Sequence, residues 1–164
     1  MLIPARIPPH KEVEDEPGPE LRLELCRRAV LGDDRLAVSD IELRRDGPSY
    51  TVDTLEVLST EAPDTELFLI VGGDIAAGLP RWREPERVLE MATLAVAERP
   101  GTRRETIDEA LSQVSGRSPT FFPMPAIGIS SSDVRERVAA GKPIRYLVPD
   151  PVAQSIAERN LYGV

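Results

Sequence analysis

The sequence predicts an α/β protein in which a parallel sheet is packed against helices. An unbroken apolar run over Leu67–Val71 ends at Gly72-Gly73-Asp74, and a second buried strand is indicated over Thr93–Ala97. Helical patterns alternate with these strands. A continuous apolar run is typical of a central parallel strand, because both faces of such a strand are covered. In open sheets of this kind, ligands bind beyond the carboxyl ends of the strands.

The composition indicates one folded domain over residues 1–164. Apolar residues make up 41% of the chain and charged residues 29%, which excludes a coiled coil, a collagen-like chain and a wholly disordered chain. The single cysteine, Cys26, excludes an internal disulfide, and the single histidine, His10, excludes a two-histidine site within this chain. A net charge of −8 argues against nucleic-acid binding. With no membrane span or signal pattern in sight, we expect a cytoplasmic protein.

The first part of the chain predicts two helices and one strand. Apolar residues recur every four positions in Pro19–Leu31 and Gly32 follows, as in an amphipathic helix. Apolar positions in Leu36–Leu43 alternate well enough to predict a strand, and Arg44–Ser49 contains a Gly-Pro turn. Thr51–Leu58 predicts a second helix with one apolar face.

The rest of the chain continues the alternation of strands and helices. The expected elements are the strand Leu67–Val71, short helices over Ile75–Leu79 and Glu84–Met91, the strand Thr93–Ala97, a helix over Thr106–Val114, a strand over Thr120–Pro123, and helices over Ser131–Ala140 and Pro151–Arg159.

The strongest local signal is Ile129–Arg135, where three serines stand at the start of a helix. The structural interpretation is a capping box, with Ser130 as the cap and Asp133 three residues later, and the spacing alone favours it. The functional interpretation adds an anion at the same place. Helix N–H groups and the helix dipole attract phosphate, and Arg135 would add a charged fork one turn further on.

Two other segments allow a structural and a functional interpretation. Gly73 and Asp74 follow the apolar run, either as a tight turn with a helix cap or as a nucleotide contact in which Asp74 accepts from ribose hydroxyls. Trp82 stands between Arg81 and Arg83. Partial packing at a domain edge is its commoner fate, and stacking on a ligand ring is the alternative.

Polar residues near prolines and strand ends are further candidates. His10 and Lys11 follow two prolines, either as a solvated surface pair or as a phosphate contact. Arg99 ends a predicted strand, as a salt-bridge residue or an anion ligand. Ser49-Tyr50-Thr51 precedes a helix, and Ser49 or another neighbour of Tyr50 is interpreted as its cap. The chain contains neither a phosphate-binding Gly-x-x-x-x-Gly-Lys-Ser loop nor a Gly-x-Ser-x-Gly elbow.

Taken together, these segments resemble bacterial nicotinate-mononucleotide adenylyltransferase over essentially the whole chain. The serine motif alone marks the wider nucleotidyltransferase superfamily, and Ser49-Tyr50-Thr51 combined with Leu79–Trp82 narrows the resemblance to this member. The segments that occur in the order of the family are Pro4–Lys11, Pro48–Leu55, Gly72–Asp74, Leu79–Trp82, Arg99–Gly101, Ile129–Arg135 and Ile144–Pro149.

The resemblance implies a Rossmann-like fold with helices on both faces of the sheet. It also implies an enzyme of NAD biosynthesis that adenylates nicotinate mononucleotide with ATP and releases pyrophosphate, with Mg²⁺ accompanying ATP. The residues implied for ATP are Ser131, Ser132, Arg135, Gly73 and Asp74. Those implied for the mononucleotide are Thr51, Trp82 and Tyr50 at the ring and His10, Lys11 and Arg99 near phosphates. No metal-ligating residue is implied, and the sequence leaves a homo-oligomer open.

One departure from the family concerns the beginning of the chain. The family opens with a strand, the motif Gly-Gly-x-Phe-Asp-Pro-x-His-x-Gly-His and a helix, none of which this sequence contains. The implied catalytic histidines are therefore not among its residues, and we expect residues 1–164 alone to be poorly stable and to form no dinucleotide. We interpret the departure as a start assigned too late, because the downstream motifs are intact. A fragment or a degenerate copy is the alternative.

Two other functions remain open from the sequence. One is a noncatalytic nucleotide-binding remnant. The other is a sister adenylyltransferase that acts on nicotinamide mononucleotide or phosphopantetheine.

Overall fold

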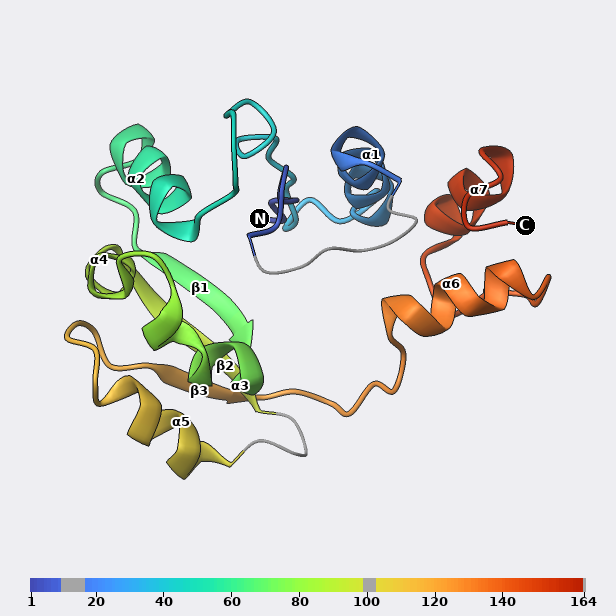
Figure 1. The fold of residues 1–164 in the computed structure, drawn as a ribbon. Coiled ribbons are helices and arrows are strands. Elements are labelled where there is room, and N and C mark those ends of the chain that lie inside the picture. Colours follow the sequence, from blue (N-terminus) through green and yellow to red (C-terminus); the bar gives the residue numbers. More distant parts are fainter. Residues whose placement is uncertain (10–16, 99–102, 164) are drawn as a thin grey trace. The chain divides into compact units, whose positions relative to one another are not determined.

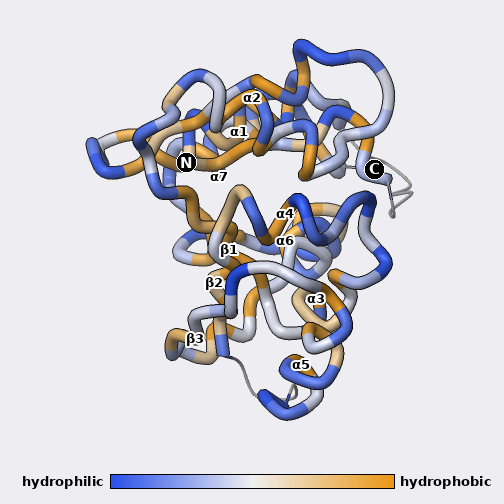
Figure 2. The backbone as a smooth tube through the Cα atoms, turned by 90° about the vertical axis from the view of Figure 1, so that its left-hand side faces the viewer, coloured by the Kyte–Doolittle hydropathy of each residue, from blue (hydrophilic) through white to orange (hydrophobic). Residues whose placement is uncertain are grey.

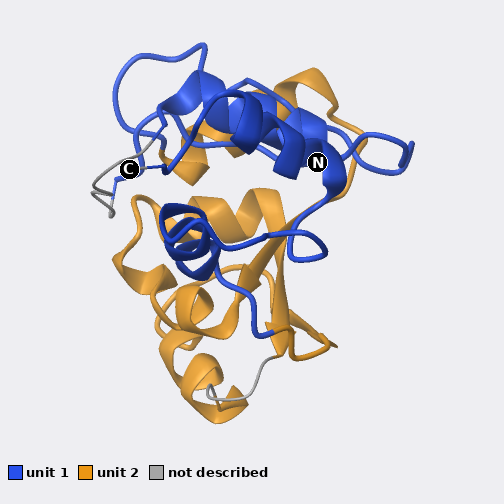
Figure 3. Cartoon of the chain, turned by 90° about the vertical axis from the view of Figure 1, so that its right-hand side faces the viewer, with its two compact units in different colours: residues 1–49, 128–164 blue, residues 50–127 orange. Residues whose placement is uncertain are grey.

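The computed structural model describes residues 1–9, 17–98 and 103–163 (Figure 1). The chain divides into two compact units (Figure 3). Unit 1 contains Met1–Ser49 and Gly128–Val164, and unit 2 contains Tyr50–Ile127. The single domain expected over residues 1–164 stays a prediction.

Unit 2 is built on a parallel sheet. Its strands are β1 (Leu67–Gly72), β2 (Ala92–Glu98) and β3 (Thr120–Pro123), in the order β1-β2-β3. Leu69 pairs with Leu94 across the first ladder, and β2 and β3 are also parallel. The parallel α/β class is thereby confirmed, together with the three strands that the sequence indicated in this unit.

The two apolar strands differ in how they are covered, which corrects one expectation. In the described chain β1 is an edge strand, and its side chains of Phe68 and Ile70 are 53% and 70% exposed. The strand β2 is the central one, with most of its residues buried. Most residues of both strands are hydrophobic (Figure 2). An apolar run reports the hydrophobicity of a strand, but not its neighbours in the sheet.

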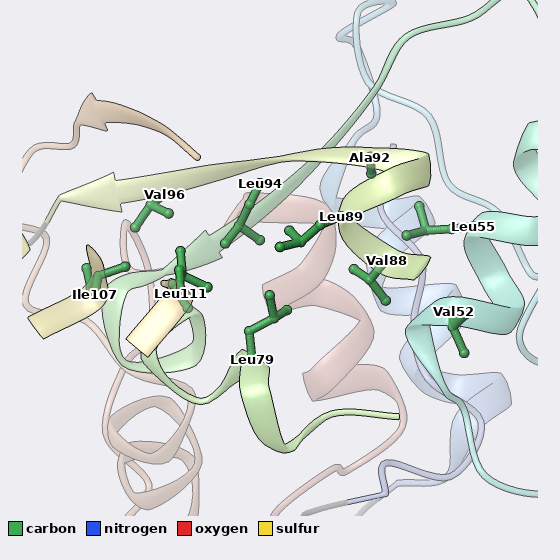
Figure 4. Packing of buried hydrophobic residues seen from close by; sticks show 11 residues of the cluster. Val52, Leu55, Leu79, Val88, Leu89, Ala92, Leu94, Val96, Ile107 and Leu111 are labelled. Atoms are coloured by element: carbon green, nitrogen blue, oxygen red, sulfur yellow. The ribbon is translucent and has the colours of Figure 1, made fainter. Parts of the chain in front are cut away.

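The helices of unit 2 share one apolar core with β2. They are α2 (Thr51–Glu61), α3 (Gly73–Ala77), α4 (Pro85–Met91) and α5 (Arg104–Leu111), with a 3₁₀ turn over Leu79–Arg81. Leu94 and Val96 extend from β2 toward Leu89 and Ile107 (Figure 4). Leu94, Val96 and Leu79 are each 0% exposed, and each such side chain contributes roughly 1.5–3 kcal/mol by burial.

A glycine brings the connection between α5 and β3 close to α4. Gly116 has φ of 145°, and a Cβ at this position would lie 2.4 Å from the Leu89 Cβ. The next residue, Arg117, donates its N–H to the Leu89 carbonyl at 3.2 Å. A side chain at position 116 would therefore collide with a buried core residue.

In its described residues, unit 1 has three helices around a second apolar cluster. They are α1 (Pro19–Ala29), α6 (Ser131–Ala139) and α7 (Asp150–Glu158), all three of which the sequence predicted. The buried residues of the cluster are Val134, Ile144, Val152 and Ile156. An ion pair of 2.6 Å between Glu24 and Arg159 links α1 to the end of α7. None of the helices in the described ranges is long and apolar enough to cross a membrane.

The prediction of a strand over Leu36–Leu43 is wrong. Among the residues that the structure describes, a single parallel bridge forms there, between Leu2 and Val38. The Asp40 carbonyl accepts hydrogen bonds from the N–H groups of Leu43 at 2.9 Å and Arg44 at 3.2 Å, which closes a turn. The Arg44 guanidinium also pairs with the Asp40 carboxylate. Local turn chemistry thus overrides the alternation of apolar residues.

A capping box fixes where α6 begins. The Ser130 Oγ accepts from the Asp133 N–H at 3.1 Å, and the Ser130 N–H donates to Asp133 Oδ2 at 2.9 Å. The Ser130 hydroxyl donates to the same carboxylate oxygen at 2.6 Å. The hydroxyl and N–H of Ser130 hold the pKa of the Asp133 carboxyl below its ordinary value, because they stabilise its charged form.

Replacing Leu94 by alanine should lower the free energy of unfolding by about 2–5 kcal/mol, because it leaves a cavity in the middle of the sheet. Urea unfolding followed by circular dichroism measures this loss. The control is Ile70→Ala on the adjacent strand, where the side chain is 70% exposed and a loss of about 1 kcal/mol or less is expected. Equal losses in the two variants would contradict the central position of β2.

The Asp133 carboxyl should titrate at a lower pKa than an ordinary aspartate, and Ser130→Ala should raise that pKa. Carboxyl resonances followed by NMR across the acid range measure it, with Ser132→Ala as the control that leaves the pKa low. Because the folded-state pKa is lowered, this contact stabilises the fold above the ordinary aspartate pKa. Its contribution is lost as pH falls through the lowered value. An Asp133 pKa that does not respond to Ser130→Ala would disprove the assignment.

Candidate functional site

The first group of candidate residues lies at the start of α6. Ser131 and Ser132 are its first two residues, and both are exposed. The first intrahelical hydrogen bond runs from the Val134 N–H to the Ser130 carbonyl at 3.2 Å. The amides of Ser131 and Ser132 precede that bond, at the positive end of the helix dipole. The two serines therefore present hydroxyl and amide donors at one helix end.

Arg135 adds a cation to this helix end. Its Nη2 donates to the Ser132 Oγ at 3.1 Å, as the spacing of three residues on a helix allows. The Asp133 carboxylate is engaged by Ser130 instead. The capping-box interpretation is confirmed, and it is compatible with an anion, because the box occupies the acidic side chain of the first turn.

The second group follows directly from β1 in unit 2. Gly73 is buried and Asp74 is exposed, and they begin α3 at the carboxyl end of the strand. In a parallel sheet this is the edge at which ligands bind.

The third group gathers aromatic rings on the core of unit 2. Tyr50 immediately precedes α2, and Trp82 ends the 3₁₀ turn. Both rings are half-buried and pack against the same apolar cluster. The guanidinium carbon of Arg83 lies 4.8 Å from the centroid of the Tyr50 ring, within the range of a cation–π contact. The sequence alone indicates Arg83 only as a neighbour of Trp82.

An ion-pair network ties the segments that carry these rings. Arg87 donates to Glu84 Oε2 at 2.7 Å and also pairs with Glu56 on α2. The hydrogen bond from Arg87 lowers the pKa of the Glu84 carboxyl. Glu84 adopts a left-handed backbone with φ of 51° just before α4. The network thus links α2 to the segment that follows Trp82. The first residue of α2 is the half-buried Thr51.

The remaining candidates have different outcomes. His10, Lys11 and Arg99 lie outside the described residues. The interpretation of Ser49 as a helix cap is wrong, because α2 has Tyr50 at that position and no side-chain cap. The Ser49 Oγ instead accepts from the Arg6 N–H at 2.8 Å. In the ranges that the structure describes, no three histidine, cysteine, aspartate or glutamate side chains gather as metal ligands would.

Comparison with known proteins relates this chain to one family. A family model described as cytidylyltransferase-like matches residues 1–137. A relative from Geobacillus thermodenitrificans, named "Probable nicotinate-nucleotide adenylyltransferase", is 40% identical over 162 residues, which cover 99% of this chain and 71% of the relative. A relative of the same name from Shouchella clausii is also 40% identical over 162 residues, which cover 99% of this chain and 80% of the relative.

A solved structure shares the fold. It is the Plasmodium falciparum nicotinic acid mononucleotide adenylyltransferase complexed with NaAD, with a TM-score of 0.72 and 17% identity, covering 98% of this chain and 80% of that one. The Rossmann-like class is thereby confirmed. The family model over residues 1–137 and the 40% identity along almost all of the sequence together show that this chain belongs to the nicotinate-nucleotide adenylyltransferase family of cytidylyltransferase-like proteins.

Proposed function

We propose that this protein transfers the adenylyl group of ATP to nicotinate mononucleotide in NAD biosynthesis. The products are nicotinate adenine dinucleotide and pyrophosphate. The observation that carries this proposal is the 40% identity, over 99% of the chain, to relatives named for this activity. Donor groups at a helix start and half-buried aromatic rings are the residue types that such a pair of substrates requires.

The chemistry needs little from the side chains beyond placement and charge. A phosphate oxygen of the mononucleotide attacks the α-phosphorus of ATP, and the bond to the bridging oxygen of pyrophosphate breaks. The nucleophile is already an anion near neutral pH, so no general base has to remove a proton. The rate then comes from aligning two anions and stabilising charge at the α-phosphate.

For ATP, the resemblance supports two proposals, one in each unit: the start of α6 in unit 1 and the end of β1 in unit 2. Ser131 and Ser132 offer hydroxyl and amide donors to the phosphates, and Arg135 offers a guanidinium held beside Ser132. Gly73 and Asp74 stand at the strand end that suits the adenosine. Mg²⁺ would arrive on the ATP phosphates, where it neutralises negative charge and usually keeps several water ligands.

For the mononucleotide side, we propose the residues around the aromatic rings. The half-buried Trp82 would stack on the nicotinate ring, with Thr51 and Tyr50 beside it. Their anchorage on the apolar core of unit 2 would hold such a stack rigidly. His10, Lys11 and Arg99 stay proposals for the phosphates from the resemblance alone.

The proposed reaction predicts a clear order of substrates. The protein from its natural reading frame, with any in-frame codons upstream of Met1, should show a higher kcat/KM with nicotinate mononucleotide than with nicotinamide mononucleotide or phosphopantetheine. Chromatographic quantification of the dinucleotide and of pyrophosphate measures it. Trp82→Ala should lower kcat/KM by about 1 kcal/mol or somewhat more, roughly fivefold to tenfold, whereas Trp82→Phe retains a ring and most of the activity. Comparable values for the acid and the amide would contradict the proposed substrate, and no turnover of any substrate would favour a noncatalytic nucleotide-binding protein.

Arg135→Ala should weaken the binding of ATP far more than that of nicotinate mononucleotide. Loss of a charge-assisted contact predicts about 1.5–3 kcal/mol, measured by titration calorimetry with each ligand. The matched control on the same helix is Arg137→Ala, because the Arg137 guanidinium is bound to the Pro143 carbonyl at 2.9 and 3.0 Å. An unchanged ATP affinity in Arg135→Ala would leave the start of α6 with a purely structural role.

A further inference from the structure

Ser49 joins two segments of unit 1 that are far apart in the sequence. Its Oγ accepts the Arg6 N–H at 2.8 Å, and its own N–H donates to the Ile7 carbonyl at 2.9 Å. The side chain of Ser49 is only 8% exposed. A buried hydroxyl and a backbone amide thus hold the same pair of residues from two directions, across 43 positions of the chain.

The other polar groups of Arg6 strengthen this junction. Its Nη1 donates to the Arg45 carbonyl at 2.7 Å and to Asp46 Oδ1 at 2.8 Å. Its carbonyl accepts from Arg22 Nη2 at 3.1 Å. We call these contacts of Arg6 and Ile7 with Arg22, Arg45, Asp46 and Ser49 the Arg6–Ser49 clasp. Because the amide, carbonyl and guanidinium of Arg6 are all engaged, the segment around it has little freedom to shift.

In the sequence, Ser49 of the clasp is close to residues that are candidates for contacting the substrate. One residue, Tyr50, separates Ser49 from Thr51, and its backbone is extended with φ of −84° and ψ of 135°. On the other side, Ile7 leads into Pro8 and Pro9, which have no N–H to donate and fix their own φ angles. Backbone hydrogen bonds near the two prolines therefore come from Arg6 and Ile7, while Leu2 anchors the start of the segment through its bridge to Val38.

We propose that Ser49 is a positioning residue for the nicotinate mononucleotide, which it influences through its hydrogen bond to the Arg6 amide and not by touching the substrate. This inference rests on the proposed function. Removing the hydroxyl leaves a partly buried N–H without that acceptor, so the clasp loosens on both of the segments that it joins. Small displacements of groups that orient a substrate reduce its productive binding strongly.

The test compares the KM values of the two substrates in Ser49→Ala. We expect the KM for nicotinate mononucleotide to rise roughly tenfold and the KM for ATP to stay within about twofold. Ser49→Thr, which keeps a hydroxyl oxygen as acceptor, should have a KM for the mononucleotide close to that of the wild type. Ser49→Cys, similar in size but a weak acceptor, should behave like Ser49→Ala and replaces it if the alanine variant does not fold.

Ser155→Ala is the matched control, since Ser155 is 1% exposed on α7 and its Oγ has no hydrogen-bond partner among the described residues. It should leave both KM values unchanged. The inference is overturned if Ser49→Ala leaves the KM for the mononucleotide unchanged, if the KM for both substrates rises together, or if Ser155→Ala produces the same shift.

Failure of the proposed function gives a different result. All variants are made in the protein from its natural reading frame, with any in-frame codons upstream of Met1. If that wild-type protein makes no dinucleotide, the function is rejected before any variant is compared. The calorimetric Kd for nicotinate mononucleotide in the wild type and in Ser49→Ala then decides the inference by the same tenfold ratio, and absence of binding to the wild type rejects it.

Discussion

Unit 2 is organised around the burial of β2 between two parallel neighbours. Hydrogen bonds to β1 and β3 occupy both of its edges, and the fully buried Leu94 and Val96 form the surface on which α3, α4 and α5 pack. A strand enclosed in this way cannot shift by one residue, because the shift would turn its apolar set to the opposite face. The positions of the connections that leave the sheet follow from this fixed register.

That register also places the proposed contacts of unit 2. Gly73 is the first residue after β1, so its location follows from the pairing of β1 with β2. The rings of Tyr50 and Trp82 rest on the same apolar cluster that β2 completes. Rigid rings lose little freedom on binding, so a stacking surface mounted on a packed core can hold a planar ligand at low entropic cost. In the proposed site, the core would thus contribute to recognition as well as to stability.

The sequence is informative where structure is decided by neighbouring residues. The apolar run of β1 and the capping box at Ser130 are visible because each is encoded within a few positions. The prediction for Leu36–Leu43 is wrong because the turn at Asp40 uses backbone and side-chain hydrogen bonds that compete with an extended chain. The hydrogen bond between Arg6 and Ser49 spans 43 positions, and no local sequence pattern predicts it. For the candidate site, the sequence predicts the residue types that could contact a ligand. The side chains that fix those residues in position can be identified only from the fold.

The approach of Gly116 to Leu89 has a consequence for how this sequence can diverge. A Cβ at position 116 would meet the Leu89 Cβ at 2.4 Å, and the adjacent Arg117 N–H is bonded to the Leu89 carbonyl. A smaller residue at 89 would relieve the collision of side chains but leave a cavity in the core, while the positive φ of 145° would still penalise any residue other than glycine. The residues allowed at positions 89 and 116 therefore depend on each other. Glycine is the only residue expected at position 116 as long as α4 keeps its place on the sheet. At Gly47 a Cβ would meet no described atom within 4 Å, so substitution there is opposed by backbone strain alone.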